Sequence, residues 1–174
     1  MRKHPLLCCL VALLGGGLLI TVAEPAAAPL QWTWHYSGAG ISASGTMTTN
    51  DVADGAGYFQ IIGITGSRNG VDIVRLQPTG TAIPGNEPYA VDNLISPVGQ
   101  QLTDNGFGFA LADDTFVNPF FAHARAPPTY LEFFSGPHRV PGNAGAGHAE
   151  LPVSFTAKLA EPAGATTSGG ANAH

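Results

Sequence analysis

Residues 58–76 read YFQIIGITGSRNGVDIVRL, and this stretch decides the fold class of the chain. Its two runs, Tyr58–Thr65 and Val71–Leu76, are rich in β-branched and aromatic residues, and the dipeptide Asn69-Gly70 lies between them. Asn and Gly accept the positive φ angles of a type I′ turn, whose twist matches that of paired strands. The stretch therefore predicts an antiparallel hairpin, with its first strand near the centre of a sheet.

Short strands are expected on both sides of this hairpin, because Gly and Pro interrupt the chain too often for helices of ordinary length. Upstream, Trp32, Trp34 and Tyr36 alternate with polar residues, and a turn at residues 37–40 leads to a second alternating run at residues 41–48. Downstream, strands are predicted at residues 89–96, 107–111, 116–124, 130–135 and 151–159. Eight or nine short antiparallel strands predict an all-β fold of the β-sandwich or jelly-roll-like kind. Closure into a barrel is left open as the alternative.

Two features of the central region suggest close packing or a binding surface. Residues 77–88 form a long connection rich in Pro and Gly, and loops of this length are usually functional or mobile. In the strand at residues 107–111, Gly108 and Ala110 leave one face nearly bare. That face is expected to pack closely against another element, with a ligand-facing groove as the alternative.

The amino terminus predicts export. Met1–His4 is basic, and the apolar run Leu6–Val22 follows it, as in a secretory signal. Cleavage is expected after Ala23, which would place the protein in the periplasm, at the cell surface or outside the cell, and a retained anchor is the alternative. Both cysteines, Cys8 and Cys9, precede this position, so no disulfide is expected in the mature chain. The predicted organisation is a signal peptide over residues 1–23, one β domain over 24–160 and a disordered polar tail over 161–174.

The charge balance argues against a nucleic-acid partner. The chain has seven Lys plus Arg against twelve Asp plus Glu, for a net charge of −5. Its basic residues are scattered singly, whereas binding a phosphate backbone needs a clustered basic surface. The charge balance therefore predicts no nucleic-acid partner, and no stable membrane span is expected after signal cleavage.

Several stretches of the sequence resemble a known protein family. Ile64–Gly70, Leu76–Pro88, Val91–Ile95, Tyr130–Ser135 and Leu151–Phe155 resemble the globular part of bacterial PEP-CTERM proteins, which are exported and sorted by exosortase. The chain departs from that family after Glu161-Pro162, where Ala, Gly, Thr, Ser and Asn follow instead of a hydrophobic helix and a basic cluster. The resemblance implies an extracytoplasmic β domain associated with the envelope or matrix, and it carries over no catalytic residue.

No strong catalytic or metal motif is present. Ser96, His35 and Asp92 could be combined into a hydrolase triad, but the chain has no Gly-x-Ser-x-Gly elbow. The acidic clusters Asn50–Asp54 and Asp113-Asp114 offer oxygen ligands for calcium, yet turns closed by their own side chains are the preferred interpretation. Three histidines of the carboxy-terminal part match no standard zinc spacing: His123, His138 and His148. We therefore predict no catalytic residue, no metal and no cofactor.

Candidate ligand contacts come from two groups of residues. Trp32, Trp34 and Tyr36 form the one aromatic stripe that could stack on sugars, although three aromatics at period two are more typical of a core. The polar group lies in the family-like strings and flanks the long connection: Arg68, Asn69, Asp92 and Asn93. For this group the favoured hypothesis is structural, with an Arg68–Asp92 ion pair that holds the long connection, and contact with sugar hydroxyls is the alternative.

Together these patterns predict an exported, noncatalytic module of the cell envelope or extracellular matrix, which contacts polysaccharide or protein. A small secreted hydrolase with an unrecognised site is the alternative.

Overall fold

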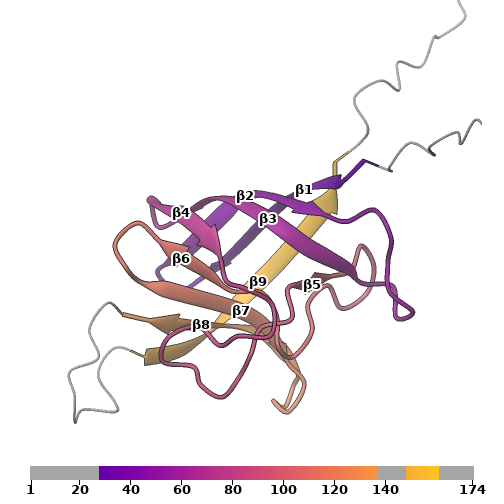
Figure 1. The fold of residues 1–174 in the computed structure, drawn as a ribbon. Coiled ribbons are helices and arrows are strands. Elements are labelled where there is room, and N and C mark those ends of the chain that lie inside the picture. The colour runs from indigo at the N-terminus through magenta and orange to yellow at the C-terminus, as the bar shows by residue number, and fades with distance from the viewer. Residues whose placement is uncertain (1–27, 137–147, 161–174) are drawn as a thin grey trace, which may run out of the picture.

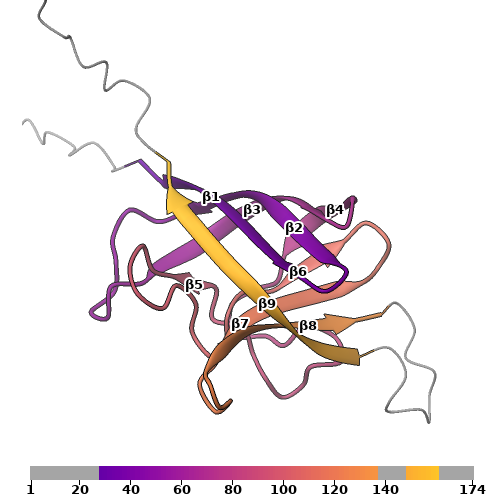
Figure 2. The same cartoon turned by 180° about the vertical axis from the view of Figure 1, so that it is seen from behind.

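The computed structural model describes residues 28–136 and 148–160, which contain nine β-strands and no helix (Figure 1, Figure 2). The strands are β1 (Leu30–Gly38), β2 (Ile41–Thr49), β3 (Phe59–Arg68), β4 (Val71–Leu76), β5 (Leu94–Ile95), β6 (Phe109–Leu111), β7 (Phe116–Ala122), β8 (Thr129–Ser135) and β9 (His148–Leu159). The predicted all-β class is confirmed. The predicted signal peptide and the predicted tail lie outside the described residues. Within the described part, no segment is a helix of the length and apolarity that crossing a membrane requires.

Eight of the strands form a closed antiparallel ring. The order is β1-β2-β3-β4-β6-β7-β8-β9, and β9 pairs again with β1 (Figure 2). The β2–β3 pairing completes the ring, and β5 pairs with β3 without taking part in it. This arrangement corrects the expected sandwich or jelly-roll, because a sandwich has two sheets with edges whereas this ladder continues around one barrel. Both architectures use strands with the same period, so the sequence pattern left barrel closure open.

Aromatic side chains fill the interior of the barrel. Trp32, Trp34 and Tyr36 of β1 are at most 2% exposed. Trp34 and Tyr36 have ring centroids 5.8 Å apart, and both pack against phenylalanines from other elements, which are Phe107, Phe109 and Phe155. Burying each side chain of this size stabilises a fold by roughly 1.5–3 kcal/mol. The barrel is therefore a packed core and not a channel.

The predicted hairpin at residues 58–76 is confirmed. Asn69 and Gly70 have φ angles of 49° and 81°, and β3 pairs with β4 next to this turn, with Arg68 opposite Val71. The β3–β4 ladder is limited to two residue pairs, while β3 pairs with β2 along most of its length and with β5 at its start. The first strand of the hairpin thus pairs on both of its edges, as every strand of the closed ring does.

Two glycines face each other where β2 pairs with β3. Gly45 of β2 lies opposite Gly66 of β3, and Gly66 has a φ of 134°. A Cβ atom on Gly66 would collide with the carbonyl oxygen of Ser44, and one on Gly45 would collide with that of Thr65. Only residues without a side chain allow the two backbones to approach this closely.

The long connection after β4 packs on the outside of the barrel. A Cβ atom on Gly108, just before β6, would lie 2.9 Å from the Cβ of Gln77 and the Cγ2 of Ile83, and 3.1 Å from the Cγ1 of Val91. Ile83 and Val91 are at most 1% exposed. The bare face at Gly108 is therefore closely packed, as expected, and is not a groove.

Two expectations about strand limits differ from the structure. The strand predicted at residues 89–96 is reduced to β5, because Asn93 has a φ of 54° and the backbone N–H of Asn93 bonds the carbonyl oxygen of Gly106 instead of a neighbouring strand. The predicted strand at residues 107–111 begins only at Phe109. The strands predicted at residues 116–124, 130–135 and 151–159 are confirmed as β7, β8 and β9, with small changes at their ends.

We predict that Gly66→Ala destabilises the barrel strongly, because the added methyl group meets the Ser44 carbonyl oxygen and the φ angle disfavours an L-residue. The free energy of unfolding should fall by roughly 2–4 kcal/mol in urea titrations. Gly55→Ala is the matched control, since a Cβ atom there meets nothing within 4 Å. Equal stability of the two variants would contradict the close approach of β2 and β3.

Candidate functional site

The aromatic stripe of β1 lies inside the barrel. The exposed fractions of Trp32, Trp34 and Tyr36 are 0%, 2% and 1%. Trp32 donates its indole N–H to the hydroxyl oxygen of Thr49 at 3.0 Å. The three rings are therefore part of the hydrophobic core. They present no face on the outer surface on which a sugar could stack.

Arg68 takes part in a polar cluster within the barrel. Its guanidinium contacts the carboxylate of Glu132 through Nε at 2.9 Å and Nη2 at 2.5 Å, and it lies 4.3 Å from the ring centre of Phe134. Tyr36 donates its hydroxyl proton to the same carboxylate at 2.6 Å. The expected Arg68–Asp92 pair is therefore wrong. Glu132, which is fully buried, is the partner instead.

The cluster connects opposite sides of the barrel. β3 carries Arg68 and β8 carries Glu132, and these strands stand four places apart in the ring of eight. Burial raises the pKa of Tyr36, and the neighbouring negative charge of Glu132 raises it further. Burial alone would lower the pKa of Arg68, but the hydrogen bonds and charge of Glu132 raise it. The Arg68 guanidinium therefore stays charged and the Tyr36 hydroxyl stays protonated.

Asn69 ties two hairpin turns together. Its side-chain oxygen accepts a hydrogen bond from the backbone N–H of Ser42 at 2.8 Å, and its amide nitrogen donates to the carbonyl oxygen of Gly40 at 2.9 Å. These contacts use both ends of the side chain, so Asn69 joins the β1–β2 turn to the β3–β4 turn.

Asn93 holds the long connection. It is fully buried, and its amide nitrogen donates to the carbonyl oxygen of Gln77 at 2.8 Å and to the hydroxyl of Thr79 at 3.0 Å. Its side-chain oxygen accepts from the N–H of Gly108 at 3.2 Å. Asn93 therefore joins the start of the long connection, at Gln77 and Thr79, to the backbone of Gly108 just before β6.

The carboxylate of Asp92, just before β5, accepts two hydrogen bonds. Its carboxylate accepts from the hydroxyl of Thr103 at 2.7 Å and from the N–H of Leu94 at 3.2 Å. Burial raises the pKa of Asp92, and the hydrogen bonds from Thr103 and Leu94 oppose this increase without cancelling it.

The turns proposed for the acidic clusters are also visible. The Asp54 carboxylate accepts from the N–H groups of Ala56 and Tyr58, and the Asp113 carboxylate accepts from the N–H and hydroxyl of Thr115. Across residues 28–136 and 148–160, no group of three or more His, Cys, Asp or Glu is arranged to hold a metal ion. The triad considered above is not assembled, since Ser96 bonds the carbonyl oxygen of Val98 while Asp92 bonds Thr103.

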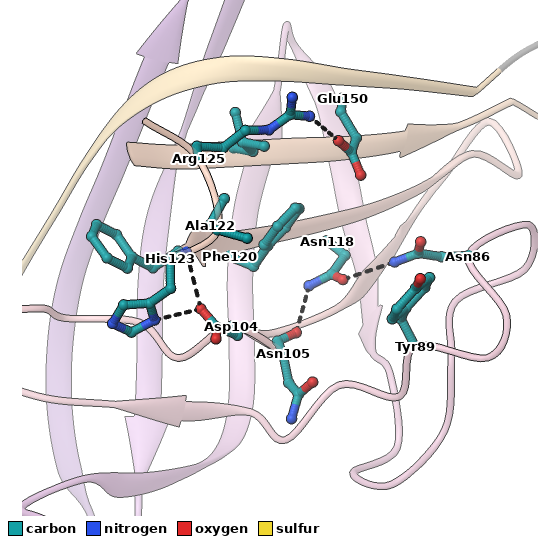
Figure 3. Close-up of a pocket in the computed structure, with 13 residues that line it drawn as sticks. Asn86, Tyr89, Asp104, Asn105, Asn118, Phe120, Ala122, His123, Arg125 and Glu150 are labelled. Carbon is teal, nitrogen blue, oxygen red and sulfur yellow. Dashed lines mark hydrogen bonds and ion pairs between the residues drawn. The ribbon is translucent and has the colours of Figure 1, made fainter. Parts of the chain in front are cut away.

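A hollow of about 430 Å³ on the outer wall of the barrel offers a different candidate site (Figure 3). Small-molecule pockets commonly measure roughly 300–1,000 Å³. Alternation along β7 places Val117 in the core, so Phe120 and Ala122 face outward, and Leu131 of β8 completes the apolar floor. We call this hollow the outer pocket. It is lined by Asn86, Tyr89, Asp104, Asn105, Asn118, Phe120, Phe121, Ala122, His123, Ala124, Arg125, Leu131 and Glu150.

Two ion pairs stand at the rim of the outer pocket. Arg125, in the turn after β7, donates from Nη2 to the Glu150 carboxylate of β9 at 2.6 Å. His123, in the same turn, places Nδ1 2.7 Å from the Asp104 carboxylate. All four side chains are substantially exposed. The pairs therefore fix charged groups at the rim without removing them from solvent.

Amides and an exposed ring form the other side of the outer pocket. Asn118 is buried and donates to the carbonyl oxygens of Asn105 and Phe107, while its own oxygen accepts from Asn86 at 3.1 Å. The long connection thereby becomes fixed to β7. Tyr89, from the same connection, is 67% exposed and lies beside Asn86 at the pocket (Figure 3).

Sequence reasoning did not assemble this pocket. Of the lining residues, His123 alone was considered from the sequence as a site residue, as one of three histidines that match no standard zinc spacing. The length of the connection at residues 77–88 was the one usable signal, because that connection supplies Asn86 and leads to Tyr89.

Comparison of the chain with protein-family models, curated proteins and solved structures finds no match. The fold and the outer pocket therefore define a class only: a closed, aromatic-filled antiparallel β-barrel with a mixed polar and apolar pocket on its outer wall.

We predict that Glu132→Gln lowers the free energy of unfolding by about 3–5 kcal/mol, because it leaves the Arg68 cation inside the barrel without a counter-charge. Glu150→Gln makes the same chemical change at an exposed ion pair and should cost less than about 1 kcal/mol. Urea unfolding of both variants measures the difference. A small loss for Glu132→Gln would show that the cluster contributes little to the barrel.

The raised pKa of Asp92 predicts a pH dependence. A carboxyl group with a raised folded-state pKa stabilises the fold fully below its unfolded pKa, and this contribution is lost as the pH rises through the folded pKa. The melting temperature of the native chain, relative to that of Asp92→Asn, should therefore be higher near pH 3.5 than near pH 7. The opposite trend would show that the ionised form is the one that the fold favours.

Proposed function

We propose that this protein is an exported, noncatalytic β module of the cell envelope or extracellular matrix, and that it contacts polysaccharide through the outer pocket. The observation that carries the proposal is the pocket itself, where apolar surface lies between fixed hydrogen-bonding groups. The predicted signal peptide and the resemblance to PEP-CTERM proteins support the location outside the cytoplasm.

The apolar part of the pocket suits the C–H faces of a sugar. Tyr89 presents an exposed ring, and Phe120, Ala122 and Leu131 form an apolar floor. Aromatic rings combine a large apolar area with few rotatable bonds, so they lose little conformational entropy when a ligand covers them.

The polar part suits hydroxyl groups. A hydroxyl both donates and accepts hydrogen bonds, and the rim offers carboxylates as acceptors beside a guanidinium and amides as donors. Because Asn118 fixes Asn86 and the ion pairs hold Arg125 and His123, these groups keep their positions before a ligand arrives. Such preorganisation reduces the entropy lost on binding.

The hydrolase alternative would depend on the His123–Asp104 pair, since a carboxylate that accepts from Nδ1–H leaves Nε2 as a base. The lining of the outer pocket contains no Ser, Thr or Cys that this base could activate. A binding role therefore accounts for the pocket better than a nucleophilic mechanism does.

We predict that Tyr89→Ala weakens co-sedimentation of the full chain with insoluble extracellular polysaccharide from the producing cells by roughly five- to tenfold, because the substitution removes the exposed ring. Val98→Ala is the control, since Val98 is 74% exposed and lies outside the pocket lining. Circular dichroism checks that both variants fold. Equal binding by the native chain and Tyr89→Ala would remove the outer pocket from the proposal.

A further inference from the structure

The two basic side chains that line the outer pocket already contact a carboxylate. Arg125 contacts Glu150 at 2.6 Å, and His123 contacts Asp104 at 2.7 Å. With the imidazole neutral, the lining carries two carboxylates against one guanidinium, a net charge of −1. The chain as a whole carries a net charge of −5, which adds a repulsive field for anions.

An acidic sugar would therefore meet an unfavourable environment. To bind Arg125, its carboxylate would have to approach Glu150, or displace it and leave Glu150 without its counter-charge. The same holds for His123 and Asp104. Like charges a few ångströms apart repel even in water, and the repulsion grows where a bound ligand excludes solvent.

An uncharged sugar meets no such penalty. A guanidinium has five N–H donors and a carboxylate has two oxygens, while the Arg125–Glu150 contact joins one nitrogen to one oxygen. Arg125 thus keeps further N–H donors beside the second carboxylate oxygen of Glu150, which is an acceptor. A sugar hydroxyl both donates and accepts, so it can bond to both groups. The amides of Asn86 and Asn105 and the hydroxyl of Tyr89 add further neutral partners.

On the basis of the proposed polysaccharide function, we infer that the outer pocket takes uncharged sugar units and rejects sugars that carry a carboxylate. Glu150 and Asp104 determine this selectivity, because they neutralise the cations that an acidic sugar would need.

The test measures the affinity of the full chain, by calorimetry, for soluble uncharged glucan, mannan and galactan, each beside the same polymer oxidised to a carboxylate at C6. At least one uncharged polymer should bind about tenfold more tightly than its oxidised form. Glu150→Gln leaves Arg125 without its carboxylate partner, so it should raise the affinity for that oxidised polymer. The ratio of the affinities for the uncharged and oxidised forms should therefore fall several-fold. Asp72→Asn is the charge-matched control, because Asp72 lies on β4 outside the pocket lining. It should leave the ratio of the two affinities unchanged.

The outcomes separate the selectivity from the proposed function. If an oxidised polymer binds as tightly as its uncharged parent, and Tyr89→Ala abolishes both, the selectivity is overturned while polysaccharide binding stands. If selective binding is the same in the native chain, Tyr89→Ala and Glu150→Gln, the pocket is not its source and the inference fails. If no polymer of either set binds, both the inference and polysaccharide binding by this chain fail for these sugars.

Discussion

A closed ring of strands requires every neighbouring pair to approach to hydrogen-bonding distance, and β2 and β3 do so at the facing residues Gly45 and Gly66. A side chain at either position would collide with a carbonyl oxygen of the opposite strand, so the absence of a Cβ atom is what lets this pair of strands form within the ring. Closure also removes the exposed edges that make open sheets prone to pair with other chains. The interior that results is narrow enough for aromatic rings from different strands to fill it.

An ion pair with one fully buried partner, Glu132, crosses the filled interior. Arg68 and Glu132 come from opposite strands of the ring, and Tyr36 adds a third polar group to the same cluster. A buried charge is costly unless it is paired and hydrogen-bonded, and each carboxylate oxygen of Glu132 has a partner. The cluster therefore favours one registration of β3 against β8, since a shift would separate the charges.

Because the interior is occupied, the candidate site lies on the outer wall of the barrel. The long connection after β4 packs over Gly108 and is fixed to β7 by the Asn86–Asn118 bond, which places Tyr89 beside the outer pocket. The turn after β7 and the start of β9 contribute the ion pairs at the rim. Loops held by a rigid barrel thus supply the candidate site, as in many β proteins whose framework is separate from their binding surface.

Local patterns in the sequence determined the strands. The Asn69-Gly70 turn, the alternation of Trp32, Trp34 and Tyr36, and the turns at Asp54 and Asp113 all depend on residues that are close in the chain. Their geometry follows from φ preferences, side-chain alternation and short-range hydrogen bonds, so they could be predicted without knowing what surrounds them.

The tertiary structure alone decided the barrel, the partner of Arg68 and the outer pocket. Arg68 and Glu132 are 64 residues apart, and Arg125 and Glu150 are 25 apart. Which pairs meet depends on the order of strands around the ring and on their register, and every amphipathic strand of this chain has the same period of two. The sequence therefore determined which segments are strands and which face of each is buried, whereas the closure of the ring determined which side chains came together to form a site.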